Sequence, residues 1–263
     1  MHSIGIWGLG MVGHAIETFL NQSTGYTVHT YDKYKPSGPV EALYTCEVLF
    51  LCLPTLYNGT TYDMSAVNDT LALLHGYTGL ILLKSTVDPS YCRRSAETYP
   101  DLNLVHNPEF LTARTAAEDF ESQRHIVLGS TSIDIPAMAR ARAFYAVLFP
   151  HAEISSVVYE AAALTKLACN AFYATKVQFF TEIYLLCNKL GLDYQTVRQL
   201  MLNNKWIHPQ HTQVPGPDGQ VSFGGACLPK DTQALHAFMA EMAVPCDVLN
   251  AVIKENLKTR PLN

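Results

Sequence analysis

The sequence has no apolar run that approaches the roughly 20 residues needed to span a bilayer. Its N-terminus enters a short strand-like segment, without a basic stretch followed by an apolar signal core. Basic residues do not predominate, because 18 lysines and arginines face 23 aspartates and glutamates, which argues against a general attraction to nucleic acid or anionic membranes. These absences predict a cytoplasmic protein whose partners are neither nucleic acids nor membranes.

Paired cysteines are also missing. The seven cysteines are scattered and include no CxxC pair. Most lie in apolar segments, as Cys52 does in residues 48–53, where a reduced thiol behaves as a small hydrophobic group. Disulfides are therefore not expected. The ten histidines show no clear metal-ligand spacing, and His208 and His211, in a segment rich in proline and glycine, predict no metal site.

Short apolar segments and helix-like stretches alternate through the first half of the 263-residue chain. The spacings leave room for helices between most of the apolar segments, which is typical of a parallel, doubly wound sheet. Strands are expected at residues 4–7, 26–31, 48–53, 80–83, 102–105 and 126–128.

The pattern changes after about residue 155. Apolar side chains recur at helical spacing through residues 157–190, and Gly191 supplies a stop. Shorter helices are expected at residues 194–202, 232–243 and 246–258. We therefore expect an α/β fold, in which a Rossmann-type doubly wound parallel sheet over residues 1–155 is followed by a smaller all-helical domain over residues 156–263.

A glycine loop follows the first expected strand. Gly8, Gly10 and Gly13 form a GxGxxG string, with Met11 and Val12 between the last two glycines and a helix-like stretch after them. In this motif the first glycine permits a tight turn, the second lets the backbone approach a pyrophosphate, and the third lets helix and strand pack closely. The N–H groups at the helix start favour the phosphate charge. The string therefore predicts a dinucleotide-binding domain.

Asp32 distinguishes between the two common dinucleotides. It ends the second expected strand, where its carboxylate can accept hydrogen bonds from ribose hydroxyls and would repel a 2′-phosphate. NAD is therefore the predicted cofactor, although Lys33, a candidate cofactor contact, and Lys35 leave NADP as an alternative. The other expected cofactor-binding residues follow the third and fourth strands: Pro54, Thr55, Ser85 and Thr86.

The most unusual string is Gly224-Gly-Ala-Cys227-Leu-Pro-Lys-Asp231. Cys227 follows small residues and precedes a proline and an expected helix, so it can sit at a helix start, where the positive helix end and Lys230 favour the thiolate. Asp231 is close enough in sequence to share a site with the sulfur. The alternative is a simple helix entry with a buried cysteine and an N-capping aspartate.

Other polar groups lie on the long helix and at strand ends. Lys166 and Asn170 are four residues apart and share one helix face, among small or apolar neighbours. An ammonium and an amide in that setting can stabilise an oxyanion, although a solvated face is the alternative. Lys84-Ser-Thr-Val87 and Asn107-Pro-Glu-Phe-Leu111 each follow a strand, where open α/β sheets bind ligands.

Together these strings resemble the nucleotide-sugar 6-dehydrogenase family, which includes UDP-glucose, UDP-N-acetylmannosamine and GDP-mannose dehydrogenases. The resemblance covers nearly the whole chain. It is carried by the Gly8 loop, Lys84-Ser-Thr-Val87, Asn107-Pro-Glu-Phe-Leu111, Leu164-Thr-Lys-Leu-Ala-Cys-Asn-Ala-Phe172 and Phe223-Gly-Gly-Ala-Cys-Leu-Pro-Lys-Asp231. It implies an NAD-dependent oxidation of a primary alcohol to a carboxylate, in two hydride transfers, on a UDP-sugar or a related small substrate.

The resemblance also implies six catalytic residues: Cys227, Lys166, Asn170, Asp231, Thr86 and Glu109. Cys227 would be the nucleophile that forms a thiohemiacetal and then a thioester. Lys166 and Asn170 would hold the developing oxyanion. Thr86 and Asp231 would position a water for proton transfer, and Glu109 would assist thioester hydrolysis as an acid/base. In relatives the helix matching residues 157–190 forms the dimer core, which implies a homodimer.

The sequence departs from the family in several places. The family usually has a second acidic residue four positions after Glu109, where this chain has Ala113 followed by Arg114. Trp206-Ile-His stands where the family has Arg-Ile-Gly. Family members continue into a third domain that binds much of the nucleotide diphosphate, whereas this sequence stops at Asn263. A nucleotide-sugar pocket built in the family way is therefore expected to be open or incomplete.

Two other functions fit parts of the pattern. A two-electron dehydrogenase of the β-hydroxyacid type shares the Rossmann-plus-helices plan, approaches this length and uses a helix lysine. A non-catalytic relative would bind NAD and be completed by a partner chain, which Ala113 and the stop at Asn263 suggest. The presence together of five of these residues argues against the non-catalytic relative: Cys227, Lys166, Asn170, Asp231 and Thr86.

Overall fold

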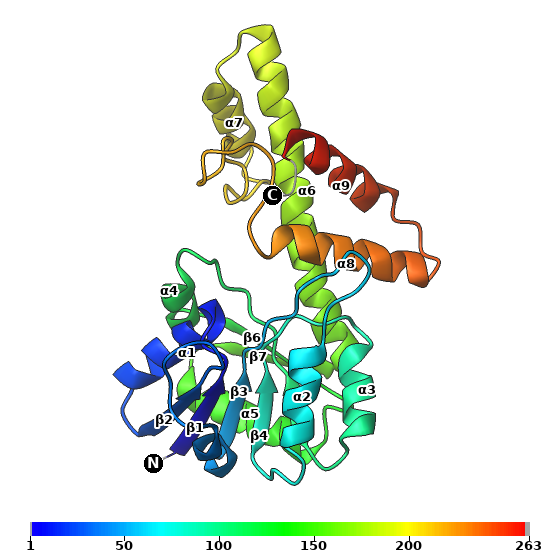
Figure 1. Ribbon diagram of the computed structural model, residues 1–263. Coiled ribbons are helices and arrows are strands. Elements are labelled where there is room, and N and C mark those ends of the chain that lie inside the picture. The colour runs from blue at the N-terminus through cyan, green and yellow to red at the C-terminus, as the bar shows by residue number, and fades with distance from the viewer. Residues whose placement is uncertain (1, 261–263) are drawn as a thin grey trace. The chain divides into compact units, whose positions relative to one another are not determined.

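A computed structural model describes residues 2–260 of the chain (Figure 1). The structure divides into two compact units. The first comprises the chain up to Asn58 together with Tyr62–Lys166, and the second comprises Gly59–Thr61 together with the chain from Leu167 onward. The sequence predicts a boundary after residue 155 between an NAD-binding domain and a helical domain. That boundary differs from the one between these two compact units, and it stays a prediction.

The first unit contains a seven-stranded sheet in the order β2-β1-β3-β4-β5-β6-β7. The strands are β1 (His2–Trp7), β2 (Tyr26–Tyr31), β3 (Val48–Leu51), β4 (Leu80–Leu83), β5 (Asn103–His106), β6 (His125–Ser130) and β7 (Glu153–Val158). Neighbours from β2 to β5 pair in parallel, as do β6 and β7. The six predicted strands are thus confirmed, with small shifts at their ends.

Two features of the sheet differ from the expectation of a purely parallel array. β6 pairs antiparallel to β5, through His106 and Gly129. β7 was not expected, because its sequence EISSVV mixes polar and apolar residues and lacks a continuous apolar run. Its position explains this composition, since β7 is an edge strand with largely half-buried side chains, whereas a central strand needs apolar side chains on both faces.

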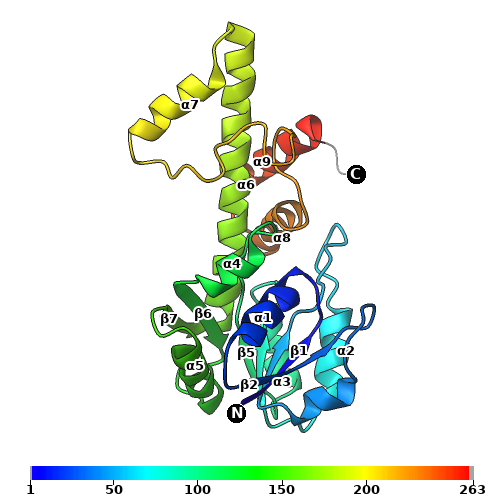
Figure 2. The same ribbon diagram turned by 90° about the vertical axis from the view of Figure 1, so that its left-hand side faces the viewer.

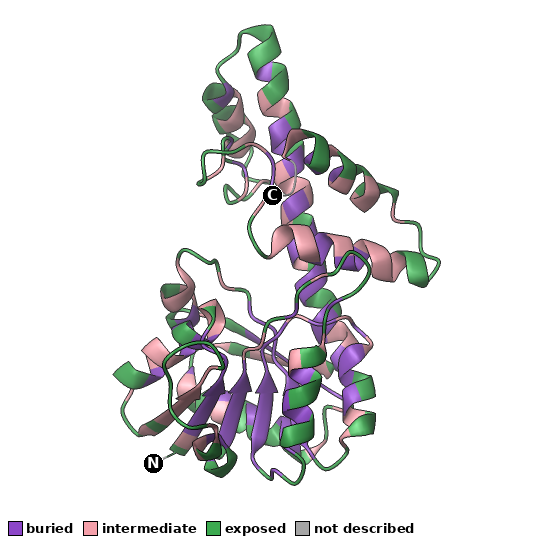
Figure 3. Ribbon diagram, viewed as in Figure 1, coloured by how far each residue is buried: buried purple, intermediate pink, exposed green. Residues whose placement is uncertain are grey.

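Helices cover both faces of this sheet, which is why the central strands are apolar throughout. All residues of β3 and β4 are buried, and Figure 3 shows this buried centre. One face packs Ile6, Phe50 and Leu82 in one cluster, and the other packs Leu49 and Ile81 in a second. The helices are α1 (Met11–Gln22), α2 (Ser65–Leu73), α3 (Tyr91–Thr98), α4 (Ala116–Glu121) and α5 (Pro136–Leu148), with the short 3-10 helix η1 (Val40–Thr45).

The second unit is built around the long helix α6 (Tyr159–Leu190), which begins in the first unit. The other helices are α7 (Tyr194–Asn203), α8 (Leu228–Glu241) and α9 (Asp247–Thr259), and Figure 2 shows them beside α6. All four predicted helices are confirmed. α8 begins four residues earlier than predicted because Pro229 occupies its first turn, where proline needs no N–H partner. Among the described helices, none is long and apolar enough to cross a bilayer.

Candidate active site

The glycine loop has the geometry that its motif predicts. Gly8 has φ +97°, and a Cβ there would lie 2.5 Å from the carbonyl oxygen of Cys52. A Cβ on Gly13 would lie 1.9 Å from the carbonyl oxygen of Gly8, so only glycine lets α1 approach the turn. Around Gly10, in contrast, nothing lies within 4 Å of the Cβ position. That open space is where the backbone must stay bare for a pyrophosphate to approach.

The start of α1 is consistent with anion binding. Gly10 occupies the N-cap position, and no side chain of the described residues caps the helix there. The N–H groups of Met11 and Val12 belong to the first turn, which has no internal acceptor for its donors. Together with the helix dipole, these donors favour a phosphate group. The loop therefore fits the diphosphate of NAD.

Asp32 follows β2 and is held against the glycine loop. Its carboxylate accepts hydrogen bonds from the N–H groups of Leu9, at 2.7 Å, and Tyr34, at 2.8 Å. Burial raises the pKa of Asp32. The two N–H donors and the Lys35 ammonium together lower it by more than burial raises it, so the pKa of Asp32 lies below its ordinary value. Asp32 is therefore an anchored anion beside the loop, as NAD selection requires. The Lys33 ammonium lies 5.5 Å from the centre of the Tyr34 ring.

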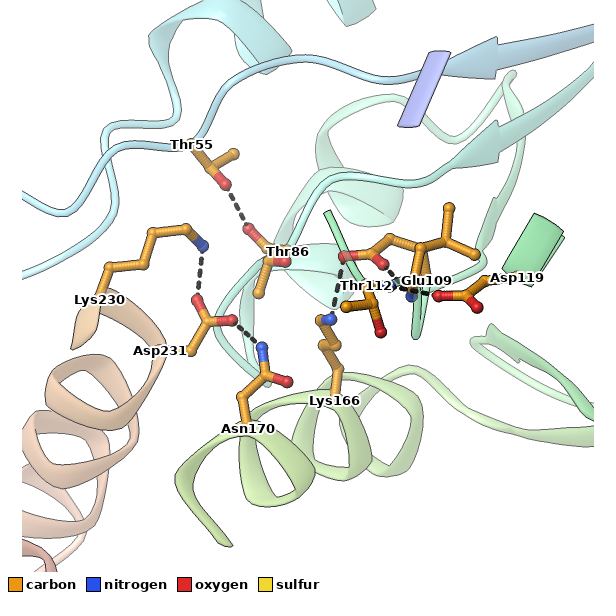
Figure 4. Close-up of polar contacts among 10 residues, drawn as sticks. Thr55, Thr86, Glu109, Thr112, Asp119, Lys166, Asn170, Lys230 and Asp231 are labelled. Atoms are coloured by element: carbon orange, nitrogen blue, oxygen red, sulfur yellow. Dashed lines mark hydrogen bonds and ion pairs between the residues drawn. The ribbon is translucent and has the colours of Figure 1, made fainter. Parts of the chain in front are cut away.

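The loops that follow β3 and β4 are tied to each other. The Ser85 hydroxyl donates to the Leu53 carbonyl at 2.8 Å, and Thr55 Oγ1 donates to the Thr86 carbonyl at 2.8 Å (Figure 4). Pro54 lies between the two tied positions. Because β1, β3 and β4 are parallel neighbours, the residues predicted to bind the cofactor all follow carboxyl ends on one edge of the sheet.

Lys166 and Glu109 form a buried ion pair within the first unit (Figure 4). Lys166 Nζ lies 3.0 Å from Glu109 Oε1, and the residues are 3% and 7% exposed. The second carboxylate oxygen of Glu109 accepts a hydrogen bond from the N–H of Leu111 at 2.6 Å. The Phe110 ring lies 5.6 Å from Lys166 Nζ and covers the ammonium. This pairing was not predicted, since the two residues are far apart in sequence.

Asn170 and Asp231 form a second buried contact, within the second unit (Figure 4). Asn170 Nδ2 donates to Asp231 Oδ2 at 2.6 Å, and Lys230 Nζ lies 2.5 Å from Asp231 Oδ1. Asp231 is completely buried, and each of its carboxylate oxygens has one of these two partners. The solvated helix face that was the alternative for Lys166 and Asn170 is therefore wrong, because both side chains are buried against carboxylates.

Cys227 is the N-cap residue of α8, at the helix start that its sequence predicted. Asp231 lies one turn further along, and its N–H donates to the Cys227 carbonyl at 3.0 Å. The alternative of a buried cysteine with a capping aspartate is wrong, since Cys227 is partly exposed and Asp231 lies inside the helix. None of the seven cysteines, all of which are described, is joined in a disulfide.

Of the two histidines considered as metal ligands, His211 packs against an aromatic ring. His211 stacks on Tyr173 with ring centroids 4.5 Å apart, and the described part of the chain contains no cluster of histidine, cysteine or acidic residues arranged for a metal. Lys84, which the sequence singled out only as the first residue of the Lys84-Ser-Thr-Val87 string, is buried and donates from Nζ to Asn107 Oδ1 at 2.8 Å. Its burial could be expected from its place after β4, but its partner depends on tertiary packing.

Two models of one family match the chain. Residues 27–148 match the UDP-glucose/GDP-mannose dehydrogenase family, NAD binding domain, and residues 160–258 match the central domain of that family. The first match agrees with the NAD preference predicted from Asp32.

Curated relatives of similar sequence are named UDP-glucose 6-dehydrogenase. The chain is 34% identical to that of Rickettsia typhi over 192 residues, covering 70% of this chain and 42% of the relative. It is 31% identical to that of Rickettsia bellii over 230 residues, covering 84% and 51%. The chain thus spans about half the length of the curated relatives it matches.

Solved structures show the same fold at low identity. A UDP-glucose dehydrogenase from Pyrobaculum islandicum has a TM-score of 0.81 and 24% identity, covering 98% of this chain and 68% of that one. The 3-hydroxyisobutyrate dehydrogenase of Mycobacterium tuberculosis has a TM-score of 0.76 and 21% identity, covering 100% and 96%. These two similarities concern the fold alone.

The family matches follow the same order as the motifs, with the NAD binding domain first and the central domain, which contains Lys166, Asn170 and Cys227, second. Sequence matches over both units and the shared fold lead to one conclusion. The chain belongs to the UDP-glucose/GDP-mannose dehydrogenase family.

Proposed function

We propose that the protein catalyses the NAD-dependent, four-electron oxidation of a primary alcohol to a carboxylate on a UDP-sugar, UDP-glucose or a close relative. One observation carries this proposal. Cys227 opens α8, and one turn later the same helix presents Asp231, a completely buried carboxylate bonded to Asn170. A partly exposed thiol at a helix start with a buried acid beside it is an arrangement suited to covalent catalysis.

Two NAD molecules, bound one after the other, would each accept one hydride of the oxidation. Gly10, with the N–H groups of Met11 and Val12, would hold the diphosphate of each, and Asp32 would bind the ribose. Four further residues follow the neighbouring strands β3 and β4. We propose that they also contact NAD: Pro54, Thr55, Ser85 and Thr86. Lys33 completes the proposed set.

Cys227 would act once the alcohol has been oxidised to the aldehyde. Its thiolate adds to the aldehyde carbon, which forms a C–S bond and places the negative charge on oxygen. Loss of the second hydride from that carbon gives a thioester. Water then adds to the thioester carbon, the C–S bond breaks, and the products are the carboxylate and the restored thiol.

The buried polar residues would serve these steps. Lys166 and Asn170, one turn apart on α6, would donate to the oxyanion that forms when sulfur adds. Thr86 and Asp231 would hold the water used in proton transfer. Glu109 would take a proton from the attacking water as the thioester is hydrolysed. Lys166 must leave Glu109 for the oxyanion, so the ion pair would describe the resting enzyme.

We further propose that the protein is a cytoplasmic homodimer. The observation for dimerisation is a row of apolar side chains on α6 that the single chain leaves exposed. Phe172, Phe179 and Leu186 recur every seven residues and are 63%, 50% and 52% exposed. A heptad spacing places them on one helix face, which is the pattern of helices that pair. The cysteines are scattered along the sequence and include no CxxC pair, which supports a reducing compartment.

The direct test of the nucleophile is Cys227→Ser, assayed with NAD and UDP-glucose. Wild-type protein stopped during turnover should carry the substrate's acyl group on Cys227, detectable by intact-protein mass spectrometry. The serine variant should carry none and should form carboxylate at least about 100-fold more slowly. Cys246→Ser, at a second partly exposed cysteine, is the matched control and should behave as wild type. Full activity in Cys227→Ser would refute the assignment.

The fold likeness to 3-hydroxyisobutyrate dehydrogenase, which spans nearly all of both chains, is the observation that keeps a two-electron dehydrogenase as a second candidate. That enzyme class would use the helix lysine without a covalent intermediate. The family matches favour the four-electron oxidation, and the number of hydrides taken from each substrate separates the two.

A further inference from the structure

The Cys227 segment, defined as residues 222–227, leads into α8 and ends at the N-cap residue of that helix. Three small residues, Gly224-Gly-Ala226, precede the cysteine, and Gly225 among them is exposed and has φ +78°. Small side chains make few contacts, and glycine lets the backbone adopt many conformations. The position of Cys227 therefore depends on how firmly the first residues of the segment are held.

Ser222 opens the segment and is surrounded by buried polar side chains of the second unit. Its φ of +58° is a left-handed conformation, which a residue other than glycine keeps only when its surroundings hold it. The Ser222 N–H donates to Thr181 Oγ1 of α6 at 3.0 Å. Its Oγ lies 2.5 Å from Gln178 Oε1 of α6 and 2.6 Å from Asn256 Oδ1 of α9. All four residues are buried, so these contacts exclude water.

The order of hydrogen bonds around the Ser222 hydroxyl follows from its single hydrogen, which it cannot donate to both amide oxygens. Gln178 Nε2 is buried and has no hydrogen-bond partner among the described residues. The two ends of an amide have nearly the same shape, and turning the Gln178 amide over brings this donor to the hydroxyl. Gln178 Nε2 then donates to Ser222 Oγ, and the hydroxyl donates to Asn256 Oδ1. Ser222 thus joins α6 to α9.

α9 contacts the Cys227 segment at three successive turns. Val252, Asn256 and Arg260 are four residues apart and share one helix face. Val252 packs with Phe223 in a buried apolar cluster. Arg260 lies so close to Gly224 that a Cβ there would fall 2.3 Å from the guanidinium carbon. Each of the first three residues of the segment is therefore held by one residue of α9, with Asn256 as the central, buried contact.

We propose that Asn256 is a positioning residue for Cys227, acting through Ser222 to fix the segment that presents the thiol. This inference rests on the proposed function, in which the Cys227 thiolate adds to the aldehyde carbon. Misplacing a reacting atom by about 1 Å can cost roughly 100-fold in rate, so loss of this contact should slow the addition. The first hydride transfer precedes the addition of sulfur and should be slowed less, which leaves aldehyde behind.

A double-mutant cycle tests whether Asn256 and Ser222 act through one contact. The variants are Asn256→Ala, Ser222→Ala and the double substitution, and Lys254→Ala, at an exposed lysine of α9, is the matched control. Thermal unfolding gives a temperature at which every variant is folded. Hydrogen–deuterium exchange at that temperature reports how firmly residues 222–227 are held. Turnover with NAD and UDP-glucose is quenched at intervals, and a hydrazine traps any aldehyde for mass spectrometry.

The expected result is that residues 222–227 exchange roughly tenfold faster in Asn256→Ala and Ser222→Ala than in the wild type or in Lys254→Ala. In the same two variants kcat for carboxylate formation should fall at least about tenfold, and aldehyde should accumulate in the quenched samples. The double variant should be no slower than the slower single variant, because both substitutions remove the same contact.

Unchanged exchange or unchanged turnover in Asn256→Ala would overturn the proposal, as would additive losses in the double variant. Slower turnover without aldehyde would also overturn it, because the loss would not lie at the step that Cys227 performs. Faster exchange in the variants, with no carboxylate formed by the wild type, would support the hold of α9 on the segment and refute the proposed function. If Asn256→Ala does not fold, Arg260→Ala, at a partly exposed residue, replaces it with the same expected results.

Discussion

Individual buried side chains determine how this protein responds to pH, and His106 at the end of β5 is the clearest example. Its ring is completely buried, and burial lowers the pKa of His106 from 6.5 to about 3. The folded protein therefore keeps this ring neutral, whereas the unfolded chain protonates it below about pH 6.5. Its contribution to stability is fully present above that pH and is lost progressively as pH falls towards 3.

We predict that the free energy of unfolding falls between pH 6.5 and 4.5 with a contribution from His106 of about 1.4 kcal/mol per pH unit. His106→Leu should lose that contribution, so its stability should decline less steeply with acid. His151→Gln, at an exposed histidine, serves as the control and should follow the wild type. Urea unfolding at several pH values measures the slopes. Parallel slopes for wild type and His106→Leu would contradict the prediction.

The residues proposed as catalytic were chosen from local strings in the sequence, which did not predict their hydrogen-bond and ion-pair partners. Lys166 and Asn170 were predicted to share a helix face, and the structure adds that a buried carboxylate holds each of them. Glu109 and Asp231 lie 57 and 61 residues away from these partners. Contacts over such separations depend on how elements pack, which no local spacing encodes.

The glycine loop between β1 and α1 shows how one element combines fold and function. Gly13→Ala should cost roughly 1–3 kcal/mol of stability, because its new methyl group would overlap the Gly8 carbonyl. Gly10→Ala is the matched variant, since its methyl group meets no protein atom within 4 Å. It should keep wild-type stability and bind NAD roughly tenfold more weakly.

Thermal unfolding and calorimetric titration with NAD together test this pair of glycines. A Gly10→Ala protein that binds NAD as tightly as wild type would show that the cofactor does not approach this loop. A Gly13→Ala protein of unchanged stability would show that α1 can shift away from the turn at little cost.

Among the elements, the buried ones were the most predictable. β3 and β4 are continuous apolar segments because helices cover both faces of the sheet, and α6 shows helical spacing over its whole length. β7 was missed because an edge strand needs no such apolar run. The antiparallel pairing of β6 with β5 was also missed, since strand direction follows from the connections between elements and leaves no trace in composition.

At the scale of the whole molecule, the exposed apolar row on α6 predicts association. The double substitution Phe172→Glu with Phe179→Glu should convert a homodimer into monomers, because it places charges in the middle of an apolar contact. Val147→Glu, at a 72% exposed valine on α5, is the control and should remain dimeric. Light scattering after size exclusion at micromolar concentration gives the mass. A monomeric wild type would contradict the homodimer.

Four-electron oxidation is the central claim, and the number of NADH molecules formed per substrate tests it most directly. Purified protein with excess NAD and a limiting, known amount of UDP-glucose is followed by absorbance at 340 nm until the reaction stops, and the sugar product is identified by mass spectrometry. The account predicts two NADH for each UDP-glucose consumed and a carboxylate as the product. One NADH per substrate, or tight NAD binding with no turnover of any nucleotide sugar, would contradict it.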